Sequence, residues 1–331
     1  MIKVQHLSKN FDGFSAVNDI SFVLEKGQVL GFLGPNGAGK STTMKMITGF
    51  LNPSSGTVLV CGEDVIRKPI AVKKCIGYLP EGAPAYGDMT VIGFLRFIAS
   101  VRGYSGLERE NKIHDAVEKS NLHKVLYKTI ETLSKGFKRR VGIAQAILHN
   151  PPVLVLDEPT DGLDPNQKHE VRNLIKEMSK DKAIIISTHI LEEVDAICDR
   201  AIVIANGELK FDGTPRELES KSVYFNSVRL TLDGYPSLNV ERSILSLEHV
   251  NRVELVYSEK EKITYQVFAK DGQSISREVN ELAKKQGWVV DELVVEKGRL
   301  DDVFRRLTEE NKIENQQDDD PLDVRLEQES A

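Results

Sequence analysis

The sequence is poor in cysteine and lacks long apolar runs. Its 331 residues include three cysteines, Cys61, Cys75 and Cys198, and no Cys-x-x-Cys pair. This content argues against a disulfide framework or a zinc site and is typical of a reducing compartment. No apolar run reaches the ~18 residues that a membrane-spanning helix needs. Because the first residues resemble a strand and not a signal peptide, we expect a cytoplasmic location.

Positive charge is not in excess either. The chain has 44 Lys and Arg residues against 50 Asp and Glu residues, a net charge of −6. Proteins that coat nucleic acid need a basic face, so we expect no nucleic-acid partner. Residues 311–331 hold seven acidic and two basic residues and almost nothing apolar. Because such a segment cannot bury enough apolar surface to fold, we predict a disordered acidic tail.

What the sequence does contain is an alternation of strand-like and helix-like segments. Val153–Leu156 and Ala183–Ile186 are continuous apolar runs, typical of strands buried in a parallel sheet. Val91–Val101 is an apolar-rich segment with helical spacing. This order predicts an α/β protein. Ile20–Leu24 and Val29–Leu33 are interpreted as a hairpin, with a turn at Glu25-Lys26-Gly27.

Beyond residue 220 the pattern changes to alternating strands with amphipathic helices, which indicates a small α+β unit. The length also favours one large and one small domain. We therefore divide the chain into three parts. They are residues 1–220 with a mainly helical segment at about 83–148, residues 221–310, and the tail 311–331.

A glycine-rich loop follows the predicted strand Val29–Leu33. Residues 34–41 read Gly-Pro-Asn-Gly-Ala-Gly-Lys-Ser and match the P-loop pattern G-x-x-x-x-G-K-[ST]. Glycines let the backbone curl so that its N–H groups face phosphate oxygens, and the following helix adds its positive end. Lys40 can reach the β- and γ-phosphates, and Ser41 can ligate Mg²⁺. The predicted nucleotide-binding residues here are Gly34, Pro35, Asn36, Gly37, Ala38, Gly39, Lys40, Ser41 and Thr42.

Two acidic residues, Asp157 and Glu158, follow the buried strand Val153–Leu156. The carboxyl ends of parallel strands form the ligand-binding edge of such a sheet. There Asp157 can hold a Mg²⁺-bound water, and Glu158 can orient or deprotonate the water that attacks a phosphate. The alternative is that the two acidic residues only end a strand. The presence of a P-loop in the same sequence favours the catalytic interpretation over this one.

Together these segments resemble the ATP-binding subunits of ABC transporters over residues 1–220. Gly34–Thr42 resembles the family's Walker A segment and Val153–Pro159 its Walker B segment. Leu133-Ser134-Lys135-Gly136-Phe137 resembles the signature motif, Asp161-Gly162-Leu163-Asp164 the D-loop, and Ser187-Thr188-His189 the segment with the switch histidine. The motifs stand in the family's order, which makes the set more specific than any one of them.

The resemblance implies an ATPase that uses ATP and Mg²⁺ and works as a homodimer or with a related ATPase subunit. Lys40, Glu158 and His189 would be catalytic, and Ser134, Gly136 and Asp164 would act across the dimer. Ser134 also stands at a helix N-cap, where it forms an anion site that in the family binds the γ-phosphate held by the other subunit.

Other positions carry the resemblance less directly. Phe11 stands where the family places an aromatic ring on the adenine, although it could equally be a core residue. Glu81 replaces the usual Gln of the Q-loop, and its carboxylate suits Mg²⁺ or its water. Lys135 and Phe137 replace a Gly and a Gln of the signature motif. These departures, with the extra C-terminal unit, are similar to the exporter branch, which includes drug-export and gliding-motility-associated ATPases.

The family assignment implies a separate integral-membrane permease, which would hold the protein on the inner face of the cell membrane. Residues 81–102 are the predicted docking segment, and its aromatic residues Phe94 and Phe97 are either exposed there or part of the core. The alternative function is a non-transport ABC ATPase that acts on nucleic acid or ribosomes. Such proteins carry long coiled-coil insertions or two ATPase domains in one chain, and this sequence has neither.

Overall fold

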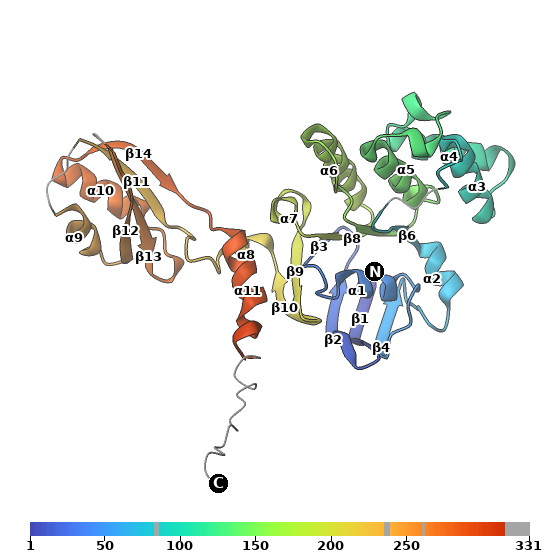
Figure 1. The fold of residues 1–331 in the computed structure, drawn as a ribbon, viewed down its shortest axis with the longest axis horizontal. Coiled ribbons are helices and arrows are strands. Elements are labelled where there is room, and N and C mark those ends of the chain that lie inside the picture. The colour runs from blue at the N-terminus through green and yellow to red at the C-terminus, as the bar shows by residue number, and fades with distance from the viewer. Residues whose placement is uncertain (83–85, 235–238, 260–261, 315–331) are drawn as a thin grey trace, which may run out of the picture.

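The computed structural model describes residues 1–82, 86–234, 239–259 and 262–314. Residues 83–85, at the start of the predicted helical segment, and 315–331, most of the predicted tail, lie outside the described residues. Within the described part there are three β-sheets: two lie together in the larger body of the protein, and the third forms a separate body at one end (Figure 1).

A six-stranded mixed sheet forms the centre of the larger body. Its spatial order is β10 (Glu208–Gly213), β9 (Arg200–Ala205), β3 (Val29–Leu33), β8 (Ala183–Thr188), β7 (Val153–Asp157) and β6 (Ile76–Leu79). All neighbouring pairs are parallel except β9 and β10, which form an antiparallel hairpin. Every residue of β3, β7 and β8 is buried. This confirms the α/β expectation and the two buried strands predicted from the sequence.

The second sheet is antiparallel, in the order β2 (Phe14–Leu24), β1 (Ile2–Phe11), β4 (Ser55–Val60) and β5 (Glu63–Asp64). The predicted hairpin between Ile20–Leu24 and Val29–Leu33 is therefore wrong, because β2 pairs with β1 and β3 belongs to the mixed sheet. The burial patterns explain why β2 and β3 belong to different sheets. Residues of β2 are partly exposed, whereas β3 is buried throughout and needs cover on both faces.

Alternate residues of the central strands face two different hydrophobic cores. Leu154 and Leu156 of β7 pack into the core shared with the helices, and Val153 and Val155 pack into the core shared with the antiparallel sheet. The helices of this body are α1 (Lys40–Ile47), α2 (Pro69–Cys75), α3 (Val91–Val101), α4 (Gly106–Lys119), α5 (Lys135–Ile147), α6 (Pro165–Ser179), α7 (Leu191–Ile197) and α8 (Pro215–Glu219). Figure 1 shows α5 and α6 on the opposite side of the mixed sheet from α1.

Helix α3 coincides with the segment predicted from helical spacing, Val91–Val101. Its two aromatic residues have different environments: Phe94 is buried, and Phe97 is 41% exposed. Tyr86 packs edge-on against both rings, with centroid distances of 6.4 Å to Phe94 and 5.6 Å to Phe97. Phe94 therefore belongs to the core, and Phe97 lies partly at the surface.

The third sheet has the order β12 (Val250–Glu259), β13 (Lys262–Ala269), β11 (Val228–Asp233) and β14 (Val289–Val295), with every neighbouring pair antiparallel. With α9 (Val240–Leu245) and α10 (Ser276–Gln286), the chain order is β-α-β-β-α-β, the split βαβ arrangement. Val240 and Ile244 of α9 and Val279 of α10 pack on one face of this sheet and form its own core.

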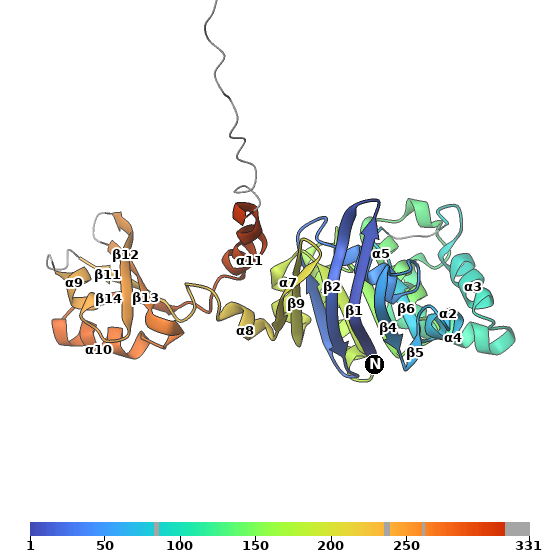
Figure 2. The ribbon, with the colours of Figure 1, turned by 90° about the horizontal axis from the view of Figure 1, so that it is seen from below.

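Two chain segments connect this sheet to the larger body, and we call residues 222–227 and 296–299 the neck. They lie side by side, since the Asn226 N–H donates to the Glu296 carbonyl at 3.0 Å and the Glu296 N–H donates to the Ser227 carbonyl at 2.9 Å. The guanidinium of Arg299 also lies 3.6 Å from the centroid of the Tyr224 ring. Figure 2 shows the same two bodies with the neck between them from a second direction.

The last helix, α11 (Leu300–Glu314), packs on the larger body rather than on the sheet that precedes it. Val303 is fully buried in the same core as Leu218 of α8 and Val203 of β9. The helix also extends past residue 310, where the sequence predicted that the tail begins. No helix in the described part of the chain is long and apolar enough to cross a membrane.

Candidate active site

The P-loop connects β3 to α1 at the carboxyl edge of the mixed sheet. Gly37 and Gly39 have φ values of +82° and +104°, in the left-handed region that favours glycine. A Cβ on Gly39 would also lie 2.5 Å from the carbonyl oxygen of Ala16, so a side chain does not fit there. The first N–H groups of α1 have no acceptor within the helix, because no residue precedes them by one turn. The loop and helix together can therefore bind a phosphate.

Lys40 is the first residue of α1, and its side chain is buried. Its Nζ donates to the carbonyl oxygens of Gly34 at 2.6 Å and of Pro35 at 3.0 Å. Burial lowers the pKa of this amine, and the negative charges of Glu158 and Asp157 partly oppose that shift. The ammonium group is thus held over the loop, close enough to exchange a carbonyl for a phosphate oxygen.

Glu158 and His189 form a pair at the ends of β7 and β8. His189 Nδ1 lies 2.9 Å from Glu158 Oε1, with 14% of the Glu158 side chain and 54% of the His189 side chain exposed. Glu158 adopts a φ of +50°, which is unusual for a residue with a side chain. Its N–H donates to the Ser187 carbonyl at 3.0 Å, and its own carbonyl accepts from Arg139. The neighbouring strand and α5 thus hold this backbone conformation in place.

Burial raises the pKa of the Glu158 carboxyl, and the hydrogen bond from His189 lowers it in part. The sequence predicts that Glu158 is the general base of ATP hydrolysis, and a general base must be deprotonated. If this prediction holds, the rate of hydrolysis falls on the acid side at a pH above the ordinary range of a glutamate. The variant His189→Ala removes the hydrogen bond that favours the carboxylate. We expect the acid limb of its pH profile of kcat, normalised to the highest kcat of the variant, to move to higher pH. The measurement is the pH profile of kcat in both proteins, and a limb that moves to lower pH would contradict the assignment of Glu158 as the base.

Oxygen donors suitable for Mg²⁺ lie around the same edge. Asp157 ends β7 and is buried, and Ser41 lies in the first turn of α1. Ser187, the residue paired with Asp157 across the two strands, has a buried hydroxyl without a hydrogen-bond partner among the described residues. Because Mg²⁺ usually takes one or two protein oxygens together with substrate phosphates, this donor set fits it. No group of three or more His, Cys, Asp or Glu residues in the described part could hold a metal alone.

Glu81 is exposed just after β6, and its charge reaches the same space. Burial raises the pKa of Tyr78 to about 12, and the charges of Asp157 and Glu81 contribute to the shift. Phe11, at the end of β1, is 43% exposed with the Lys9 ammonium 5.0 Å from its ring centroid. The ring is available for stacking, and its predicted adenine contact stays a prediction.

The remaining predicted residues gather at a different place. Ser134 caps α5 and accepts from the Phe137 N–H at 3.4 Å, as the sequence predicted. Asp164 caps α6 and accepts from the Gln167 N–H at 2.9 Å, and the Gln167 side chain lies directly against Gly136. No hydrogen bond within the described ranges connects Ser134, Gly136 or Asp164 to the P-loop, and α5 and α6 lie on the opposite side of the mixed sheet from α1 (Figure 1). The predicted residues thus form two groups, which we call half-sites.

The comparisons with known proteins agree with this geometry. A family model described as "ABC transporter" matches residues 17–161. The uncharacterized ABC transporter ATP-binding protein YxlF of Bacillus subtilis (strain 168) is 37% identical over 238 residues, which cover 71% of this chain and 79% of that protein. The chain belongs to the ABC transporter ATP-binding family. It is accordingly an ABC ATPase, with an ATP-hydrolysing domain.

Other relatives of this ABC ATPase differ in length. The probable multidrug ABC transporter ATP-binding protein YbhF of Escherichia coli (strain K12) is 34% identical over 250 residues, which cover 75% of this chain and 42% of that protein. The solved structure of cbiO1 from Clostridium perfringens, described as part of the ABC transporter complex cbiONQ, has a TM-score of 0.61 and 30% identity. It aligns with 66% of this chain and 90% of its own. About a third of this chain therefore lies outside that alignment.

Sequence reasoning missed one side chain of the site. Arg139 of α5 is buried and donates to the carbonyl oxygens of Pro80 and Glu158. It joins the Q-loop position to the Walker B position through backbone atoms. No sequence pattern marked it, because its partners are backbone carbonyls 59 and 19 residues away.

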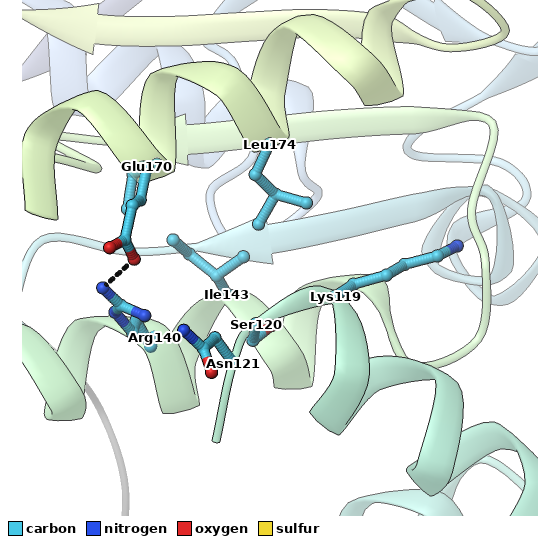
Figure 3. A pocket seen from close by; sticks show the side chains of 8 residues that line it. Lys119, Ser120, Asn121, Arg140, Ile143, Glu170 and Leu174 are labelled. Atoms are coloured by element: carbon cyan, nitrogen blue, oxygen red, sulfur yellow. Dashed lines mark hydrogen bonds and ion pairs between the residues drawn. The ribbon is translucent and has the colours of Figure 1, made fainter. Parts of the chain in front are cut away.

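A cavity of about 40 Å³ lies elsewhere in the ABC ATPase, between α4, α5 and α6 (Figure 3). Arg140 and Glu170 form an ion pair of 2.5 Å across it, and the buried hydroxyl of Ser120 has no partner among the described residues. A polar cavity of this size has room for ordered water. It is lined by none of the predicted site residues, so it is separate from the nucleotide site.

Proposed function

We propose that this ABC ATPase is the energy-providing subunit of an exporter, working as a homodimer that closes on ATP and drives a separate membrane permease. The observation that carries the proposal is that α5, whose N-cap is Ser134, lies on the opposite side of the mixed sheet from α1, which follows the P-loop (Figure 1). The P-loop with Glu158 and His189 supplies one half, and Ser134 with Gly136 supplies the other. Two copies in opposite orientation would bring the two kinds of half-site together on two ATP molecules.

In the proposed reaction, Lys40 and the P-loop N–H groups bind the β- and γ-phosphates, and Ser41 and Asp157 hold Mg²⁺. When bound there, Mg²⁺ would supply positive charge that neutralises and orients the phosphates. Glu158 positions and deprotonates the attacking water, while His189 keeps the Glu158 carboxylate in place and can contact the γ-phosphate. Ser134 of the second copy donates to the same phosphate, so hydrolysis removes the contact that closes the dimer.

The names of the relatives support transport rather than another use of ATP. YbhF is named as a probable multidrug transporter component, and cbiO1 is described as part of a transporter complex. The solved dimer of the bacterial ABC transporter cassette MJ0796, at 22% identity, supports the fold alone, with a TM-score of 0.61 over 65% of this chain. A membrane permease would keep this protein at the inner face of the cell membrane.

The proposed permease contact includes the exposed aromatic ring of Phe97 on α3. We expect Phe97→Glu to reduce the amount of integral-membrane protein that copurifies with the tagged chain by about tenfold, because a charge replaces a half-buried ring at the contact. Leu255→Glu, at a 60% exposed apolar position on β12, is the matched control and should retain the partner. The ATPase activity of both isolated variants should stay at the parent level. Copurification of nucleic acid or ribosomes in place of a membrane protein would contradict the transport proposal.

A further inference from the structure

Glu193 is a buried carboxylate that the reaction above does not use, and it contacts the segments that carry Glu158 and His189. Glu193 of α7 has no solvent exposure. Its Oε1 accepts a hydrogen bond from Thr160 Oγ1, and its Oε2 accepts one from Thr188 Oγ1 at 2.9 Å. The nearest guanidinium, that of Arg172 on α6, lies 3.9 Å from Oε1. A buried charge is costly unless it is paired and hydrogen-bonded, so this group is held by two hydroxyls and a cation.

The two threonines belong to the two segments that carry the Glu158–His189 pair. Thr160 follows Glu158 by two residues, and Thr188 directly precedes His189. Both threonines are buried, and Thr188 Oγ1 also accepts from the Ile190 N–H at 3.0 Å. The Glu193 carboxylate therefore connects the segment after β7 to the end of β8.

We propose that Glu193 is a positioning residue for ATP hydrolysis, because its carboxylate holds Thr160 and Thr188 and through them fixes the 2.9 Å hydrogen bond between Glu158 and His189. The Ser187 carbonyl and Arg139 hold the backbone of Glu158 at its positive φ, and the Glu193 hydrogen bonds add support two residues further along the same segment. The inference rests on the catalytic roles proposed for Glu158 and His189. Within the described part of the chain, the hydrogen bonds and the ion pair of Glu193 go to Thr160, Thr188 and Arg172 and not to the P-loop.

The first test is Glu193→Gln, which keeps the size of the side chain and removes its charge. The amide has one oxygen in place of two, so only one of the two threonine hydroxyls keeps an oxygen acceptor on this side chain. One of the two segments therefore loses its hydrogen bond to residue 193. We expect kcat for ATP hydrolysis to fall by about 10- to 100-fold, as for other small displacements of catalytic groups. The Kd for ATP should stay within about threefold, because Lys40 and the P-loop are unchanged. Glu192→Gln, the same change at the exposed neighbouring position, is the control and should keep the parent kcat.

A matched pair at Thr188 keeps the inference testable if Glu193→Gln does not fold. Thr188→Ser retains the hydroxyl that donates to Glu193, and Thr188→Val retains the shape without it. We expect the valine variant to lose kcat by about tenfold and the serine variant to stay within about twofold of the parent. A kcat that is unchanged in Thr188→Val, or lost equally in both variants, overturns the positioning role. So does a loss of ATP affinity that accounts for the whole effect.

Failure of this inference can be told from failure of the proposed function with one further variant. If Glu158→Gln stops hydrolysis and Glu193→Gln does not alter kcat, Glu158 is the base and Glu193 has no positioning role. If Glu158→Gln itself hydrolyses ATP at the parent rate, the base assignment is wrong, and the role of Glu193 falls with it.

Discussion

ATP hydrolysis by Glu158→Gln is expected to fall by about 10²- to 10⁴-fold, the usual contribution of a general base. The amide keeps the shape of the side chain and can still accept a hydrogen bond from His189, but it cannot take a proton from water. Nucleotide binding should survive, because the P-loop and Lys40 lie on other elements. We therefore expect ATP to hold this variant as a stable dimer, measurable by size-exclusion chromatography with light scattering.

The control for this experiment is the same variant with ADP, which lacks the γ-phosphate that the Ser134 end of α5 would bind. It should elute as a monomer. A dimer that forms equally with ADP would contradict the proposed closure on the γ-phosphate. An unchanged hydrolysis rate would refute the role of Glu158.

Lys40→Ala is expected to weaken ATP binding by about 10- to 100-fold, because hydrogen bonds to charged groups contribute about 1.5–3 kcal/mol each. The parent amine is buried and already held over the loop by the Gly34 and Pro35 carbonyls, so little ordering is needed when phosphate arrives. Titration with a fluorescent ATP analogue gives the Kd directly. Lys45→Ala, an exposed lysine on the same helix, is the control and should bind like the parent.

The Lys40 result also separates binding from folding. Removing the amine takes away the hydrogen bond that it donates to the buried Gly34 carbonyl, whereas the Pro35 carbonyl still accepts from the Ala38 N–H. Some loss of thermal stability is therefore expected as well. If Lys40→Ala remained folded and bound ATP with the parent Kd, the P-loop assignment would be wrong.

Local patterns predicted most of the fold's elements correctly. The helix Val91–Val101 can be predicted from its apolar content and spacing, because a helix that packs on a core shows its period in the sequence. The strands β7 and β8 were found because burial on both faces requires continuous apolar residues. The same logic failed at residues 25–27, where a short turn between two strands carried no information on which sheet each strand joins.

The residues of the candidate site also fall into those that the sequence predicts and those that it does not. The P-loop, Asp157, Glu158 and His189 could be located from the sequence, since each motif is short and contiguous, and the structure places Glu158 beside His189. Arg139 and Glu193 could not be located, because Arg139 binds backbone carbonyls 59 and 19 residues away and Glu193 binds the Thr160 hydroxyl 33 residues away. Long-range contacts of this kind leave no periodic or local signal.

The return of α11 to the larger body makes the third sheet an insertion rather than an appendage. Cutting the chain after residue 220 would remove Val303 from the core that it shares with Leu218, and would expose that apolar surface. Such a truncated protein would lose stability for a reason unrelated to any regulatory role of the sheet. An internal excision that joins the two sides of the neck, and keeps Leu300–Glu314, is the deletion that would reveal what the inserted sheet does.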